Sequence, residues 1–458
     1  MINKVVQAGL LVCIIMLMVI YQLTTRGEVL FILLLLLGTY LILSLHQLTR
    51  IALLLLFISA LVTGLVVFRL PTPLVPLREA STSFGFLAAF IATLTLLRIP
   101  AYRSRIMRQC GHVILSQPPG RRYPLLSIGT MLFGVVLNMG VLNLSASMMD
   151  KANSLEAAKG REWLRNLRRK RMLLAALRGF ALLPLVTPMG VGVAIILASM
   201  PTLGWAQLYP YTFTVATLIF LLGWLSDYLG GPHPLKPPAV ADRHSLMPLL
   251  NFALVLIGLV ALVFICAWIL QLRLPQAVLI GVPLGCLIWL GVQLRSIGLF
   301  GVAPAIVLIT RRLPAVLGSI GNEVVLLGAG AYLGKLSVSL VGPEVLSGIL
   351  GMGTPAAASL AMLLMVTMSL LGLNPIITAS FVASAVSRLD IPDISLPAMA
   401  TAILTGWALA AACSPFTASM IILSRVTGLS PSRIGLRWNG KFVGCCLLGG
   451  MIGFFIFL

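Results

Sequence analysis

The sequence has 458 residues, of which 59% are hydrophobic and only 9% are charged, whereas an ordinary soluble domain has roughly 25% charged residues. This composition excludes a water-soluble fold. Lysine and arginine outnumber aspartate and glutamate by 32 to 11, for a net charge of +21. In a membrane protein the first interpretation of such an excess is that basic residues mark the cytoplasmic loops. Nucleic-acid binding is only the second interpretation. The seven cysteines lie almost all in apolar runs without metal-ligand spacing, which predicts buried hydrophobic thiols rather than disulfides or a metal site.

The predicted elements are membrane-spanning helices. A hydrocarbon core about 30 Å thick requires roughly 20 apolar residues per helix. The first candidate follows a lone Lys4 and lacks a small-residue cleavage site, so it is predicted to be a retained span rather than a signal peptide. In chain order the predicted spans are 8–23, 29–46, 51–68, 82–97, 173–200, 208–229, 247–270, 276–310, 313–335, 396–424 and 440–458.

Two further apolar stretches are predicted to be re-entrant hairpins. Residues 98–122 carry six basic residues and residues 149–172 carry eight. If the stretch 124–148 crossed the membrane, one of these clusters would lie outside, against the positive-inside rule. The stretch 124–148 is therefore predicted to enter and leave on the cytoplasmic side. For the remaining charges to follow the same rule, the stretch 346–387 must enter and leave on the outer side. With a cytoplasmic N-terminus, this topology places 25 of the 32 basic residues in the cytoplasm.

A short motif occurs twice, at nearly half-chain spacing. Thr187-Pro188-Met189-Gly190 and Ser414-Pro415-Phe416-Thr417 begin 227 positions apart, and each is followed by Ile-Ile-Leu. Each copy follows a predicted hairpin, and the hairpins open in opposite directions. This pattern predicts two inverted repeats, residues 1–246 with an extra N-terminal helix and residues 247–458, as in many secondary transporters. The alternative is that proline and small residues serve only close helix packing.

The repeated motif predicts broken helices whose ends bind a solute. A mid-span proline removes a backbone donor, which is tolerated at membrane depth only where the freed groups meet protein, water or a ligand. Half-helix N-termini favour an anion, and exposed carbonyls favour Na⁺ as a coupling ion. The polar candidates are expected to converge near the midplane. The candidate solute- and ion-binding residues, at hairpin tips and breaks, are Asn138, Asn143, Thr187, Pro188, Gly190, Asn374, Thr378, Ser414, Pro415 and Thr417.

This layout resembles the ion transporter superfamily, which includes divalent-anion/sodium symporters and arsenite-efflux permeases. The resemblance lies in the order hairpin, broken helix, hairpin, broken helix, with Asn138 or Asn143 and Asn374 at the tips. The symporters carry Ser-Asn-Thr at each tip, whereas this chain has Leu137-Asn138-Met139 (or Leu142-Asn143-Leu144) and Leu373-Asn374-Pro375. The resemblance implies an elevator-type carrier, often a homodimer, in which a domain with both hairpins moves against a scaffold.

Other residues have alternative interpretations. Glu323 is predicted to lie about ten residues into its span, where a buried carboxylate serves either a coupling ion or proton, or a structural partner. The basic stretch 154–171 contains Leu155, Trp163, Leu164 and Leu167 and predicts an amphipathic helix on the cytoplasmic surface. It lacks the aromatic interleaving of a nucleic-acid site.

The sequence therefore predicts a secondary active transporter of a bacterial-type inner membrane that moves a small anionic solute, coupled to Na⁺ or H⁺. The bilayer and the solute are its expected partners. We expect neither an enzyme nor a resident cofactor or metal, because no phosphate loop, nucleophile elbow or carboxylate pair occurs. The alternatives are an efflux permease for a neutral or metalloid species, a cation/proton antiporter on the same scaffold, or a multi-span protein that handles lipid-linked substrates.

Overall fold

The computed structural model describes residues 2–115, 119–153, 156, 160–230, 245–295, 301–389 and 394–457, and this part of the chain contains helices and no strand. Ten of its helices are long and apolar enough to cross a membrane, and a bent pair of helices is an eleventh candidate. The prediction of an all-helical polytopic membrane protein with about eleven spans is confirmed.

The N-terminal third follows the predicted order of spans. Its helices are α1 (Ile2–Thr24), α2 (Gly27–Ser44), the short η1 (Leu45–Gln47), α3 (Arg50–Arg69), α4 (Leu74–Leu96), α5 (Arg98–Arg103) and α6 (Arg105–Leu115). α4 packs along α16 (Gly321–Val338). An ion pair joins Glu79 near the start of α4 to Lys335 near the end of α16 at 3.6 Å, and another joins Glu323 at the start of α16 to Arg98, just after the end of α4, at 3.4 Å. α4 and α16 are therefore antiparallel.

The first predicted hairpin and broken helix occupy the middle of the chain. They form α7 (Pro119–Leu137), α8 (Gly140–Ala152), α9 (Glu162–Ala181), α10 (Leu183–Val186) and α11 (Val191–Ser199). The described residues of the helix predicted over 154–171 are helical, but they form the first half of α9 rather than a helix of their own. The position of this segment on the cytoplasmic surface stays a prediction. Arginine and lysine are good helix formers, so the basic segment continues into the apolar one without a break. Residues 154, 155 and 157–159 lie outside the described residues.

The next five helices correct one predicted boundary. They are α12 (Trp205–Leu229), α13 (Met247–Ile269), α14 (Leu274–Leu294), α15 (Val302–Leu317) and α16. The predicted spans 276–310 and 313–335 are wrong in their bounds, because α14 ends at Leu294 and because Arg311-Arg312, which separate the two predicted spans, lie within α15. Both arginines are exposed and need not interrupt a helix. The chain bends by 70° after Leu317 instead, between α15 and α16.

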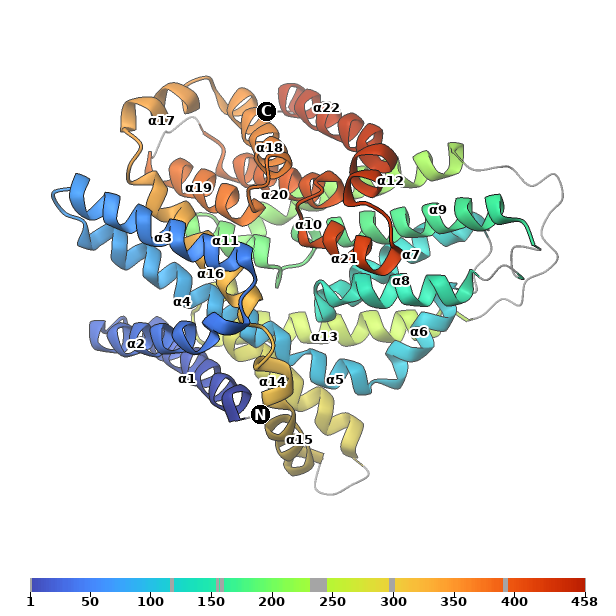
Figure 1. Ribbon diagram of the computed structural model, residues 1–458, viewed down its shortest axis with the longest axis horizontal. Coiled ribbons are helices and arrows are strands. Elements are labelled where there is room, and N and C mark those ends of the chain that lie inside the picture. Colours follow the sequence, from blue (N-terminus) through green and yellow to red (C-terminus); the bar gives the residue numbers. More distant parts are fainter. Residues whose placement is uncertain are drawn as a thin grey trace.

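The second predicted hairpin and broken helix complete the fold. The last elements are α17 (Pro343–Leu350), α18 (Thr354–Leu370), α19 (Pro375–Arg388), α20 (Leu396–Cys413), α21 (Ala418–Thr427), the π-helical η4 (Arg433–Trp438) and α22 (Asn439–Phe457). Figure 1 shows α10 and α20 in the interior, with α1–α4 on one side and α6–α9 on the other. Most residues of α4, α9–α11 and α20–α21 are buried, whereas most residues of α1–α3, α12, α13 and α22 are not.

Two glycines permit close helix contacts at matching places. A Cβ atom on Gly179 of α9 would collide with the backbone of Ser127 on α7, and one on Gly406 of α20 would meet the carbonyl oxygen of Met362 on α18. The two glycines are 227 positions apart, the same spacing as the repeated motif. The first arm of each hairpin is thus packed backbone to backbone on the broken helix that follows it, as small residues allow in membranes.

We expect Gly179→Ala to lower the free energy of unfolding by about 1–3 kcal/mol, the usual cost of overpacking a close-packed interior. Thermal or denaturant unfolding of the protein in nanodiscs measures this cost. Gly258→Ala in α13 is the matched control, because a Cβ atom there meets nothing within 4 Å. Equal stability of the two variants would show that α7 and α9 are free to separate.

Candidate functional site: two helix breaks

The two predicted breaks have the same backbone geometry. α10 and α20 are followed directly by Thr187 and Ser414, both in extended conformation, and the next helices start after Gly190 and Thr417. Each break is a four-residue turn with proline second, closed by a hydrogen bond from Gly190 N to Thr187 O (3.2 Å) or from Thr417 N to Ser414 O (3.3 Å). Proline favours the second position of such turns. The motif found in the sequence is therefore one turn that occurs twice.

The first predicted hairpin consists of two helices, α7 and α8, whose outer ends both lie near α9. α7 turns into α8 at Asn138, which has a φ of 50°, and Met139. Asn153 at the end of α8 bonds Arg165 on α9 (2.8 Å), while Arg122 near the start of α7 lines a cavity with Arg168 of α9. Both ends of this hairpin thus adjoin the N-terminal half of α9. Whether it re-enters the membrane from the cytoplasm stays a prediction.

In the second hairpin the tip faces the second break. Asn374 caps α19, and its side-chain oxygen accepts a hydrogen bond from Ile376 N at 3.1 Å. Gly372 lies against the ring of Phe416, and the hydroxyl of Ser414 donates to the carbonyl oxygen of Ser369 at 2.6 Å. Thr378 is buried one turn into α19. The tip of the hairpin and the break are therefore one connected unit.

The two halves are interlocked through the second parts of their broken helices. α21 packs on α8 of the first hairpin, and α11 packs on α19 of the second. Figure 1 shows α21 beside α8 and α11 close to α19. Within each half, the first hairpin arm packs on the first part of the broken helix, α7 on α9 and α18 on α20. The contacts thus follow one pattern in both halves. The inverted orientation of the halves in a membrane stays a prediction.

The second break satisfies its polar groups within the protein. Thr417 Oγ1 donates to Ser414 O (2.8 Å), Ser419 Oγ donates to Ala411 O (2.8 Å), and Asn439 Nδ2 donates to Ala412 O (2.9 Å). These carbonyl oxygens at the end of α20 already have donors, so they are poor candidates for binding Na⁺. The expectation that Ser414 and Thr417 make their main contacts with a ligand is not supported by these bonds.

The first break lacks the corresponding donors. The positions equivalent to Thr417 and Ser419 are Gly190 and Gly192, which have no hydroxyl. Thr187 is only 6% exposed, and its hydroxyl has no hydrogen-bond partner among the described residues. A buried polar group without a partner costs about 1–3 kcal/mol, so a ligand or water that bonds to Thr187 would stabilise this break.

The first break lies against α20, the helix that leads to the second break. Gly192, after the first break, lies against Leu404 of α20. Leu404 precedes Ser414 by ten residues, which is about 15 Å of α-helix. Whether the candidate residues at the two breaks converge on one site stays a prediction. Asn143, an alternative tip residue, is exposed on α8 away from the turn, which is at Asn138.

Glu323 lies elsewhere than predicted. It is in the first turn of α16, not about ten residues into a span, and both carboxylate oxygens lie 3.4 Å from Arg98. The neighbouring Asn322 accepts a hydrogen bond from Thr49 N at 2.7 Å, in the connection between α2 and α3. Glu323 thus lies just after the bend between α15 and α16, beside the connection between α2 and α3. This placement favours the structural alternative over a coupling role.

One buried charge was not among the predicted site residues. Arg178 on α9 is 6% exposed, donates to Asn439 Oδ1 (2.9 Å) and to Gly223 O (3.2 Å), and stacks on Phe442 at 3.8 Å. Its position inside an apolar span was the available signal, since charges there mark functional or structural centres. Over the described residues no three His, Cys, Asp or Glu side chains are grouped as a metal site.

Neither a family model nor a curated protein matches the sequence. Among solved structures, MtrF of Neisseria gonorrhoeae, described as illuminating a class of antimetabolite efflux pumps, is similar at a TM-score of 0.49 and 12% identity. The match covers 90% of this chain and 95% of the MtrF chain. At this level of similarity the function has to be inferred from the geometry of the two breaks.

Proposed function

We propose that the protein is a secondary active transporter for a small anionic solute, which binds at the first helix break beside Thr187. The observation that carries this proposal is the contrast between two turns of equal backbone geometry. The second turn is filled by the hydroxyl groups of Thr417 and Ser419. The first has glycine at both equivalent positions and a buried hydroxyl without a partner.

The first break offers donors suited to an anion. The first N–H groups of any α-helix have no acceptor within the helix and carry the positive end of its dipole. At α11 these belong to the residues after Gly190, in an interior where neighbouring helices exclude lipid. Thr187 adds a hydroxyl donor at the same turn. An oxyanion fits this combination better than a cation does.

The interlocked halves suggest how the solute would move. The two hairpins and two broken helices, α7–α11 and α18–α21, pack on each other across the repeat. The antiparallel pair α4–α16 joins the two halves separately, with an ion pair at each end. We infer an elevator-type movement of the interlocked unit against surrounding helices, in a homodimer within a bacterial-type inner membrane and with the N-terminus in the cytoplasm.

The coupling ion is part of the proposal. Na⁺ or H⁺ would supply the gradient. Because the carbonyl oxygens at the end of α20 are already bonded, an ion is better accommodated near the first break. Solute export, as in an efflux permease, would use the same site with the cation moving in the opposite direction to the solute.

Flux measurements in proteoliposomes test the function. We expect an anionic solute, from a panel of dicarboxylates and inorganic anions, to accumulate against its gradient only when a Na⁺ or H⁺ gradient is imposed. Counterflow with each solute preloaded detects export as well as uptake. Exchange of Na⁺ for H⁺ without movement of any anion would replace this proposal by a cation/proton antiporter, and no flux of any solute in either direction would contradict transport.

A further inference from the structure

The N-terminal half of α9 and the π-helical η4 meet around one tryptophan. The ring of Trp438 lies 5.7 Å from Lys170 Nζ on α9 and 5.7 Å from the guanidinium carbon of Arg433 on η4, which is within cation–π range. Next to Lys170, Arg169 donates to Thr427 O at the end of α21 at 3.1 Å. These contacts connect the first half of the chain to the second. We refer to the following residues as the basic surface: Lys170, Arg433, Arg437, Trp438 and Lys441.

The π-helical turn places the charges of η4 on one face. In a π-helix the hydrogen bonds run between residues five apart, so Arg433 and Trp438 face each other across one turn, whereas an α-helix would place them about 140° apart. Arg437 is four residues from Arg433 and four from Lys441, a spacing that keeps the three cations on the same side. The irregular turn therefore gathers three cations and an aromatic ring.

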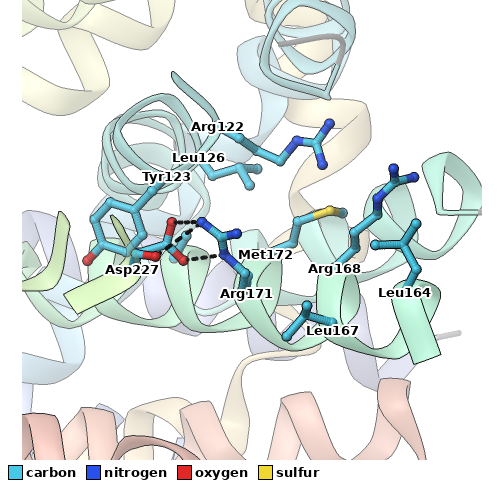
Figure 2. A pocket seen from close by; sticks show the side chains of 10 residues that line it. Arg122, Tyr123, Leu126, Leu164, Leu167, Arg168, Arg171, Met172 and Asp227 are labelled. Atoms are coloured by element: carbon cyan, nitrogen blue, oxygen red, sulfur yellow. Dashed lines mark hydrogen bonds and ion pairs between the residues drawn. The ribbon is translucent and has the colours of Figure 1, made fainter. Parts of the chain in front are cut away.

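Acidic side chains do not balance this charge. The basic residues of η4 and α22 are exposed, and residues 394–458 contain no aspartate or glutamate. On α12, Asp227 is already held by Arg171, whose Nε and Nη2 lie 2.8 and 2.6 Å from its two carboxylate oxygens (Figure 2). Among the described residues, no ion pair involves Lys170 or the basic residues of η4 and α22. The basic surface therefore attracts anions.

The basic surface lies at the polar ends of two candidate spans. These spans are Glu162–Ser199 and Arg433–Phe457. α9 is basic up to Arg171 and mainly apolar after it, and α22 is apolar after Lys441. Basic residues and tryptophan are typical of the level of lipid headgroups at such ends, where long basic side chains keep their charge in the polar layer and their stems along apolar surface. The anions present at this level are those of the bilayer.

We propose that the basic surface binds the headgroups of anionic phospholipids. The phosphate group lies against Arg433 and Arg437, because its oxygens accept the paired N–H donors of guanidinium groups, and the acyl chains lie along the apolar turns of α22. Because Lys170 is on α9 and the other cations are on η4 and α22, a bound lipid contacts both halves of the chain. The basic surface is separate from the first break and does not depend on which solute is transported.

Lipid binding to purified protein tests this surface without any transport measurement. Delipidated protein in detergent is titrated with phosphatidylglycerol, and with phosphatidylcholine as the neutral lipid, and native mass spectrometry gives the affinity for each. The test variant is the double variant Arg433→Gln/Arg437→Gln, with Arg433→Lys/Arg437→Lys as its charge-retaining partner. The matched control is Arg311→Gln/Arg312→Gln, which removes the same charge from two exposed arginines of α15, a helix far from α22 in Figure 1.

We expect the wild type to bind phosphatidylglycerol more tightly than phosphatidylcholine. The glutamine double variant should bind phosphatidylglycerol about 25-fold more weakly, because each basic residue near an anionic lipid surface contributes about fivefold. The lysine double variant should fall between, and the α15 control should bind as the wild type does. Melting temperatures without lipid identify a variant that fails to fold, and Lys441→Gln, with an expected loss of about fivefold, then takes its place. Unchanged affinity in the glutamine variant, an equal loss in the α15 control, or equal wild-type affinity for the two lipids would overturn the proposal.

Discussion

Asn439→Ala should lower the free energy of unfolding by about 3 kcal/mol, because one fully buried side chain satisfies two groups. Its Oδ1 accepts from Arg178 Nε, and its Nδ2 donates to Ala412 O, both at 2.9 Å. A hydrogen bond to a charged group contributes about 1.5–3 kcal/mol, and a buried carbonyl left without a donor costs about 1–3 kcal/mol. The hydrogen bonds and ring contacts of Arg178 within the described part of the chain are all with neutral groups.

Unfolding in nanodiscs by heat or denaturant measures this effect, with Cys445→Ala, an exposed neighbour on α22, as the control. A double variant isolates the contribution of the charge. Arg178→Met removes the group that Asn439→Ala leaves unbonded, so the combined loss should be smaller than the sum of the two single losses. Additive losses would show that Arg178 and Asn439 act independently. A melting temperature equal to that of Cys445→Ala would contradict the predicted role of Asn439.

The pattern of apolar runs predicted the helices because a span of fixed length must be apolar throughout, and this requirement leaves a signal in composition alone. The breaks were predictable for a related reason. Proline within an apolar run cannot continue the hydrogen-bond ladder, so Pro188 and Pro415 marked the turns within one residue. The separation of 227 residues, about half of the chain, then indicated that the two prolines belong to an internal repeat.

The position of Glu323 along its helix and the identity of its ion-pair partner were not predictable from the apolar pattern. Glu323 was placed at mid-span because the apolar run around it is long, but the chain bends between Leu317 and Gly321 and starts a new helix there. Nothing local to Glu323 reveals that Arg98, 225 positions away, is its partner. Long-range pairing of this kind follows from helix packing rather than from local sequence.

The same limit applies to the breaks. Sequence similarity predicted equal roles for Thr187 and Ser414, whereas the surrounding hydroxyl and amide donors differ. Ser414 meets Ser369, which is 45 positions earlier, and the carbonyls before it are bonded by Ser419 and Asn439. The glycines at 190 and 192 were visible in the sequence. That these glycines leave the first break without hydroxyl donors follows only from comparison with Thr417 and Ser419, which occupy the equivalent positions of the second break.

Thr187→Val should reduce transport about 10- to 100-fold while leaving the protein as stable as the wild type or slightly more stable. Valine keeps the shape of threonine and removes a buried hydroxyl that has no partner in the described structure, so folding loses no hydrogen bond. Bonding of that hydroxyl to an anionic solute contributes about 1.5–3 kcal/mol, which is lost in the variant. Initial rates of flux at several solute concentrations and unfolding in nanodiscs measure the two effects separately.

Ser414→Ala is the matched comparison, because the two residues are equivalent positions of the same turn. Its hydroxyl donates to Ser369 O at 2.6 Å, so alanine should destabilise the fold by about 1 kcal/mol, and any loss of transport should follow the loss of folded protein. Thr187→Ser keeps the hydroxyl and should transport nearly as well as the wild type. If Thr187→Val transports normally, or if its loss of flux is matched by a loss of stability as in Ser414→Ala, the first break is not the solute site, because its hydroxyl then acts on folding and not on a ligand.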